Sequence, residues 1–386
     1  MKVKQRPEDF RVEELTDVVA SKTGDFALYR LDKIGWTTPD ALAVVRRRWK
    51  IDMRRLAFAG LKDRHADTTQ FLTIYRGPSR NLTHEKIHVT YLGQVEEPFS
   101  SAHIRANRFT ITVRHLTAQD ELAALKAINE IPHVGVPNYF DDQRFGSVND
   151  GDFIGREMVF GRFEQALRLA LTAPYEHDRA EAKREKATLR MYWGDWSQCT
   201  VKLGQSDARP LTNFLATNPH DFAGAVARLK PELGGLYLAA YQSYLWNKML
   251  DRWLRDQFPR QNLGTIRLSV GDFAVPLTGN DELLKEWSTL TMPLPSARLK
   301  ESSTVIDAVL ADEGLTLPLL KVPGLEKPFF SKGDRIACLR PEGLSTAAGD
   351  DDLNRERRKL QLTFELPRGC YATMVIKRIT SVQVPT

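Results

Sequence analysis

The sequence from residue 58 to residue 70 reads Phe58-Ala-Gly-Leu-Lys-Asp-Arg-His-Ala-Asp-Thr-Thr-Gln70 and places one carboxylate, Asp63, between two cations, Lys62 and Arg64. An opposite charge favours the ionised form of an acid, so such a carboxylate stays ionised at neutral pH. An ionised carboxylate is a poor general acid but a plausible nucleophile or an anchor for a cationic group. A salt-bridged acid in a turn is the structural alternative, and the local sequence supports it equally well.

A metal site is a further interpretation of this stretch. Asp63, His65 and Asp67 alternate and offer oxygen and imidazole ligands. However, Lys62 and Arg64 directly flank Asp63 and would repel a cation. We therefore expect no metal here.

Length and composition indicate a globular protein. The chain has 386 residues, which suggests two domains, and it is 42% hydrophobic and 27% charged. It contains no run of about 18 apolar residues, and its first residues resemble no secretory signal, so we expect neither a membrane span nor secretion. Cys199, Cys338 and Cys370 are widely spaced and form no CxxC pair, which favours a reducing cytoplasm.

The net charge is moderately positive, at +6. Such a charge suggests a polyanionic partner without establishing one, because many basic proteins bind no nucleic acid. Nothing in the sequence indicates an obligate protein partner, so we expect a monomer.

Hydrophobic periodicity in the first 130 residues favours an α+β fold. Thr38 is the expected N-cap of a helix that has Pro39 in its first turn. The predicted strands are 10–15, 26–31, 70–75 and 108–114, and the predicted helices are 37–49 and 118–130.

The turn cluster at residues 149–152 is a natural domain boundary. Beyond it, residues 161–190 read as charged helices, and residues 235–254 read as a long helix whose aromatic side chains belong to a core. Residues 263–340 read as strands and loops, and residues 364–384 read as strand-like around a turn.

A second group of polar and aromatic residues extends from Val136 to Ser147 and contains Asn138, Phe140, Gln143 and Arg144. Aromatic faces stack on nucleobases, amides pair with base edges, and arginine binds phosphate. A packed aromatic turn is the alternative. Two weaker segments, 4–14 and 366–374, each place an aromatic side chain beside charged or turn residues.

Together the four segments resemble the TruD family of transfer RNA pseudouridine synthases. The family pattern is similar to K-x-x-P-E-D-F, A-G-x-K-D-[RK]-x-A-x-T-x-Q, N-Y-F-x-x-Q-R-F-G and L-P-x-G-x-[FY]-A-T. All four occur here in this order and span the chain. The second and third patterns are the most specific.

The resemblance implies isomerisation of uridine to pseudouridine in tRNA, at position 13 in the bacterial members, without a cofactor. It implies that Asp63 is the nucleophile and that Lys4, distant in sequence, is the basic partner that keeps it ionised. The residues expected to bind the substrate are Phe10, Asn138, Phe140, Tyr371, Arg64, Gln143 and Arg144. Tyr371 stands where the family carries an aromatic residue, often phenylalanine.

The resemblance also implies a divided architecture. Residues 1–150 together with 338–386 would form a pseudouridine synthase catalytic domain with a curved antiparallel sheet, and residues 151–337 would form an inserted TruD-specific α+β domain. The expected partner is tRNA. A non-catalytic RNA-binding or RNA-folding chaperone with a degenerate synthase site is the alternative function, and a metal-dependent RNA hydrolase using Asp63, His65 and Asp67 is a third.

Overall fold

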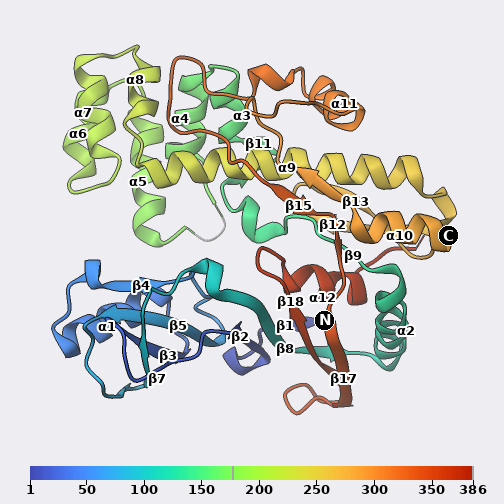
Figure 1. Ribbon diagram of the computed structural model, residues 1–386. Coiled ribbons are helices and arrows are strands. Elements are labelled where there is room, and N and C mark those ends of the chain that lie inside the picture. Colours follow the sequence, from blue (N-terminus) through green and yellow to red (C-terminus); the bar gives the residue numbers. More distant parts are fainter. Residues whose placement is uncertain (176–177, 385–386) are drawn as a thin grey trace. The chain divides into compact units, whose positions relative to one another are not determined.

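The computed structural model describes residues 1–175 and 178–384 and divides into two compact units (Figure 1). The first unit contains Met1–Gly135 and Leu339–Thr380, and the second contains Val136–Cys338 and the residues from Ser381 on. The chain therefore passes between the units near residues 135, 338 and 380. The assignment of 1–150 with 338–386 to catalysis, and of 151–337 to an insertion, stays a prediction.

The first unit is built on a sheet that has ten strands in the described part of the chain. All of its described strand pairs are antiparallel except the pair of β2 (Phe10–Thr16) and β5 (Asp67–Tyr75), so the sheet is mixed and not wholly antiparallel as predicted. The α+β class is confirmed. In spatial order the strands are β17 (Glu342–Asp350), β18 (Arg358–Leu366), β8 (Ile104–Leu116), β2 (Phe10–Thr16), β5 (Asp67–Tyr75), β3 (Phe26–Ile34), β7 (Ile87–Val95) and β6 (Leu82–His84), with β1 (Lys2–Val3) beside β8 and β4 (Leu56–Phe58) beside β5.

Helix α1 (Thr38–Trp49) covers one face of this sheet at β3 and β5. Its buried residues include Leu42 and Val45, which pack in one cluster with Tyr29 and Leu72 of the strands. The N-cap is Thr37, not Thr38 as predicted, because Thr37 has extended backbone and its hydroxyl accepts a hydrogen bond from the Asp40 N–H.

Two helices far apart in sequence, α2 (Ala118–Val134) and α12 (Ala372–Thr380), pack against each other in the first unit. The prediction of strand-like structure over 364–384 is therefore wrong beyond β18. The buried residues Ala372, Val375, Ile376 and Ile379 recur every three or four positions, which is helical spacing, although valine and isoleucine are also frequent in strands.

The second unit is organised around α9 (Pro231–Gln257), the long yellow helix of Figure 1. Tyr241 and Trp246 are fully buried in it, which confirms that its aromatic residues belong to a core. None of the helices in residues 1–175 and 178–384 has the length and apolar content needed to cross a membrane.

Shorter elements make up the rest of this unit. Helices α4 (Phe163–Thr172) and α5 (Ala180–Met191) confirm the predicted helical range 161–190, of which residues 176 and 177 lie outside the described residues. The range 263–340 also contains two helices that periodicity did not indicate, α10 (Asp281–Thr289) and α11 (Thr304–Asp312). The other helices are α3 (Ile154–Val159), α6 (Trp196–Leu203), α7 (Arg209–Thr217) and α8 (Phe222–Ala227). The strands are β9 (Val136–Pro137), β10 (Val148–Asn149), β11 (Asp152–Phe153), β12 (Leu263–Leu268), β13 (Gly271–Pro276), β14 (Thr291–Pro293), β15 (Asp334–Ile336) and β16 (Cys338–Leu339).

Candidate active site around Asp63

The loop that carries Asp63 connects β4 to β5 and is fixed by two buried side chains. The Lys62 N–H donates to the Thr38 hydroxyl at 3.0 Å, and this hydroxyl donates to the Gln70 amide oxygen at 2.8 Å. The Gln70 amide also donates to the Gly60 carbonyl at 3.2 Å. Helix α1 and strand β5 therefore set the path of the loop on either side of Asp63.

The Asp63 carboxylate forms an ion pair with Lys4, 59 residues away in sequence. Its other oxygen accepts the His65 N–H at 2.9 Å. Burial would raise the pKa of Asp63, but the hydrogen bonds from Lys4 and from the His65 backbone outweigh it, so the pKa lies below its ordinary value. The carboxylate is therefore ionised at neutral pH, and the predicted proximity of Lys4 is confirmed.

Both partners remain accessible. The side chains of Lys4 and Asp63 are 28% and 30% exposed. The Lys4 ammonium also lies 4.1 Å from the centroid of the Phe10 ring, close enough for a cation–π contact. Phe10 is itself buried and meets Phe109 edge-on at 6.3 Å. Lys4, Phe10 and Asp63 are thus brought together in the first unit.

The cations adjacent in sequence do not hold Asp63. Lys62 turns to the buried Glu14 carboxylate, at 2.8 Å, and to the Asn107 amide oxygen, at 3.0 Å. Arg64 is exposed. The charge pattern of the local sequence was therefore correct in predicting an ionised Asp63 but wrong in the cations it indicated.

Lys33 is a residue of this site that the sequence interpretation missed. It is fully buried on β3, and its ammonium donates to the Asp63 carbonyl at 3.0 Å and to the Trp36 carbonyl at 2.7 Å. Burial lowers the pKa of Lys33 to about 8, although the Asp63 charge acts in the opposite direction. A signal existed, because Lys33 follows Tyr29 and Leu31 at the inward-facing positions of its strand.

The free energy of unfolding of the wild type is expected to rise at alkaline pH, and replacing Lys33 with Met is expected to remove this rise. The folded-state pKa is about 8 and the ordinary value is 10.5, so between these pH values the unfolded chain binds more protons. The free energy of unfolding of the wild type should therefore rise with pH over this window, by up to about 3 kcal/mol, relative to Lys33→Met. Urea denaturation between pH 7.5 and 10 measures this difference. The exposed Lys22→Met is the control and should keep the rise; parallel curves for wild type and Lys33→Met would contradict the assignment.

Asn138 lies in the second unit and is almost completely buried. Its amide nitrogen donates to the Ile336 carbonyl at 2.9 Å, and its amide oxygen accepts from the Arg335 guanidinium at 2.5 Å. Arg335 also donates to the Asn138 backbone carbonyl. Both ends of the amide are therefore occupied within this unit.

Phe140 follows in the same segment and is held through its backbone. Asn247 of α9 accepts from the Phe140 N–H at 2.8 Å and donates to its carbonyl at 2.9 Å. The ring meets Trp246 edge-on at 5.6 Å, and the Arg335 guanidinium lies 4.1 Å from its centroid. Arg335 was missed because nothing in its local sequence indicates a partner about 200 residues away.

The remaining predicted substrate residues are distributed between the two units. Arg144 lies 5.4 Å from the Phe140 ring centroid, and Gln143 is exposed nearby in sequence. Tyr371 is partly buried in the first unit and directly precedes α12, where its carbonyl accepts the Met374 N–H at 3.0 Å.

Asp63, His65 and Asp67 do not form a group of metal ligands in this arrangement. Asp67 pairs with Arg11 at 3.5 Å, while the Asp63 oxygens face Lys4 and the His65 N–H. In residues 1–175 and 178–384, no group of three or more His, Cys, Asp or Glu side chains is placed to hold a metal ion.

Comparisons with known proteins converge on one family. A family model described as tRNA pseudouridine synthase D (TruD) matches residues 1–379. A Methanococcus maripaludis protein named "Probable tRNA pseudouridine synthase D 1" is 31% identical over 396 residues, covering 99% of this chain and 100% of that protein. The tRNA pseudouridine synthase D of Aquifex aeolicus is 27% identical over 397 residues, covering 98% of each chain. A crystal structure from Methanosarcina mazei, described as that of the "Putative tRNA pseudouridine synthase D (TruD)", matches with a TM-score of 0.75 at 26% identity, and the match covers 99% of this chain and 94% of that one.

Proposed function

Because the chain belongs to the TruD family of tRNA pseudouridine synthases, we propose that it converts the uridine at position 13 of tRNA to pseudouridine with Asp63 as the nucleophile. The observation that carries this proposal is the ion pair between Lys4 and Asp63. It supplies an ionised, partly exposed carboxylate held by an ammonium that also lies over the Phe10 ring. The first unit would be the catalytic part of the protein. The protein would act on tRNA as a monomer in the cytoplasm.

The reaction breaks the bond between the ribose and N1 of uracil, rotates the base and joins the ribose to C5. Uridine and pseudouridine have the same atoms, and one proton leaves C5 while one is gained at N1, so no cofactor is needed for balance. The Asp63 carboxylate would attack the sugar or the base, or remove a proton from the ribose. Each route requires the ionised form that Lys4 stabilises.

The other residues would bind the substrate. The target base must leave its stack before an enzyme can reach it, and an apolar ring is a suitable surface for a flipped base. Phe10 and Tyr371 of the first unit, and Phe140 of the second, would each provide such a surface, and Asn138 would support the segment that carries Phe140. Arg64, Gln143 and Arg144 would contact the RNA. Lys33 would fix the backbone carbonyl of Asp63 and thereby the direction of its side chain.

Release of tritium from tRNA labelled at C5 of its uridines tests the function directly. Purified protein should release the label of one uridine per tRNA, and a transcript with cytidine at position 13 should release none. A non-catalytic chaperone would release no tritium. A metal-dependent hydrolase would instead cut the strand and lose activity with a chelator. Release from the position-13 variant equal to that from the wild-type transcript would contradict the proposed site.

Replacing Lys4 with Met is expected to lower kcat at neutral pH on the order of 10²-fold, because one charged donor to the nucleophile is lost. The pKa of Asp63 would then rise, because the hydrogen bond from the His65 N–H would oppose the effect of burial without the Lys4 ammonium beside it. Since the protonated acid is inactive, the acid limb of the kcat profile should move to higher pH. Steady-state kinetics between pH 5 and 8 measure both effects, and Lys4→Arg should restore part of the rate. An unmoved acid limb would show that Lys4 does not keep Asp63 ionised.

A further inference from the structure

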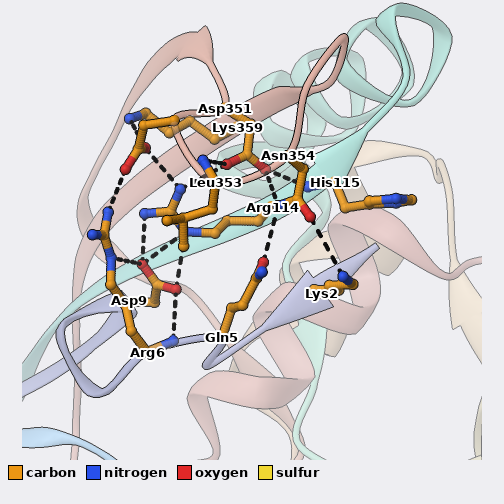
Figure 2. A network of polar contacts seen from close by, with 11 residues as sticks. Lys2, Gln5, Arg6, Asp9, Arg114, His115, Asp351, Leu353, Asn354 and Lys359 are labelled. Atoms are coloured by element: carbon orange, nitrogen blue, oxygen red, sulfur yellow. Dashed lines mark hydrogen bonds and ion pairs between the residues drawn. The ribbon is translucent and has the colours of Figure 1, made fainter.

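The N-terminal segment that carries Lys4 is tied to the loop between β17 and β18 by the polar network of Figure 2. Arg114 of β8 is the centre of this network and is almost completely buried. Its guanidinium binds Asp9 at 2.9 Å and both Asp351 and Asp352 at 2.8 Å. One buried cation therefore joins the 3₁₀ turn at residues 7–9, strand β8 and the 351–357 loop.

The loop contacts residues on both sides of Lys4. The Asn354 amide donates to the Gln5 side chain at 2.9 Å, and its oxygen accepts from the Lys2 ammonium at 3.4 Å. The Arg6 guanidinium binds Asp352 at 2.6 Å. Asn354 is itself fixed by Asp351, whose carboxylate accepts its amide at 2.8 Å. The residues at positions 2, 5 and 6 are thus held while Lys4 is left to point at Asp63.

Lys4 needs such support because its backbone is left-handed, with a φ of 58°. A residue with a side chain rarely adopts this conformation, and it persists only where the surrounding structure determines it. On the N-terminal side, Lys2 and Val3 pair with Arg114 and Val113 of β8. On the C-terminal side, the contacts of Gln5 and Arg6 with the loop supply the constraint.

We propose that Asp352 and Asn354 are positioning residues that hold the backbone of Lys4 in its left-handed conformation and so place its ammonium on Asp63. The proposal rests on the proposed function of Asp63 and Lys4. Neither residue touches the reacting atoms. They act through Gln5 and Arg6, and a small displacement of a catalytic group is enough to slow a reaction markedly.

The Asp352 and Arg6 side chains are each 42% exposed, and an ion pair between exposed groups contributes little to stability. Asp352 also binds the buried Arg114, which keeps Asp9 and Asp351 as partners when Asp352 is replaced. A change in turnover can therefore be separated from a loss of folding.

The charged groups that act on Asp63 are Lys4, from the N-terminal segment, Lys33 of β3, which reaches only its carbonyl, and His65, which acts through its backbone N–H and its charge. Lys33 and His65 are unchanged in a variant of the 351–357 loop, so a shift in the acid limb of its turnover reports on Lys4.

The test is the double variant Asp352→Ala/Asn354→Ala, assayed by tritium release. We expect kcat to fall roughly ten-fold with little change in KM, and the acid limb to move to higher pH as in Lys4→Met. Gln5→Ala removes one of the same links from an exposed position and should give a smaller shift in the same direction. Asp350→Ala is the matched control: it lies beside the loop and pairs with Arg358, away from the N-terminal segment, and should behave as wild type.

The double variant combined with Lys4→Met should be no slower than Lys4→Met alone, because the loop would act only through Lys4. Multiplied losses, or an acid limb that stays in place in both the double variant and Gln5→Ala, would overturn the inference. These outcomes differ from a failure of the proposed function, in which Asp63→Asn would retain turnover.

Discussion

Asp63→Asn is expected to lower pseudouridine formation on the order of 10⁴-fold or more while tRNA binding stays within a few-fold of wild type. Asparagine has nearly the shape of aspartate but cannot act as an anionic nucleophile, and removing such a group from other enzymes has effects of this size. Single-turnover tritium release and filter binding measure the two quantities. Asp63→Ala should behave in the same way.

Asp67→Asn is the matched control for this experiment. Asp67 belongs to the same segment and pairs with Arg11 at the surface, where an ion pair contributes little. Near-wild-type turnover by Asp67→Asn, together with an inactive Asp63→Asn, would also argue against a metal site that needs both acids. Full turnover by Asp63→Asn would remove Asp63 as the nucleophile.

Arg114→Met is expected to destabilise the protein by about 3–5 kcal/mol, because removing one member of a buried ion pair leaves an uncompensated buried charge. Asp9 and Asp351 are 2% and 7% exposed. Burial would raise the pKa of Asp351, but the backbone N–H groups of His115 and Leu353, the Asn354 amide and Arg114 hold it well below its usual range. Losing Arg114 removes one of these compensating groups and the main partner of Asp9.

Chemical denaturation at pH 7 measures this effect. Arg11→Met is the control, since the Arg11 side chain is 59% exposed and pairs with Asp67 at 3.5 Å; the substitution should cost less than about 1 kcal/mol. A loss in Arg114→Met no larger than that of the control would show that the network of Figure 2 does not anchor the N-terminal segment.

Local patterns predicted several elements of the first unit but not β7 or β17. Strands β2, β3, β5 and β8 and helices α1 and α2 lie where hydrophobic periodicity indicated them. Helix α12 was mistaken for a strand because its β-branched residues fit either period over so short a length. In the second unit, α4 and α5 were predicted but α11 was not; α11 packs against α9, a contact that local periodicity does not report.

The contacts of the candidate site were predicted less well from local sequence than the helices and strands were. The immediate sequence suggested Lys62 and Arg64 as partners of Asp63, whereas the structure gives this role to Lys4. Only the resemblance to a family indicated that distant pair. Lys33 could have been found as a lysine at an inward-facing strand position, but the pairing of Arg335 with Asn138 has no local signal.

The most direct measurement of the central claim is a map of pseudouridines in tRNA from cells that lack this protein, complemented with wild type or with Asp63→Asn. The account predicts that pseudouridine disappears from position 13 alone in the deletion strain, that the wild type restores it, and that Asp63→Asn does not. Restoration by Asp63→Asn, or an unchanged map in the deletion strain, would contradict it.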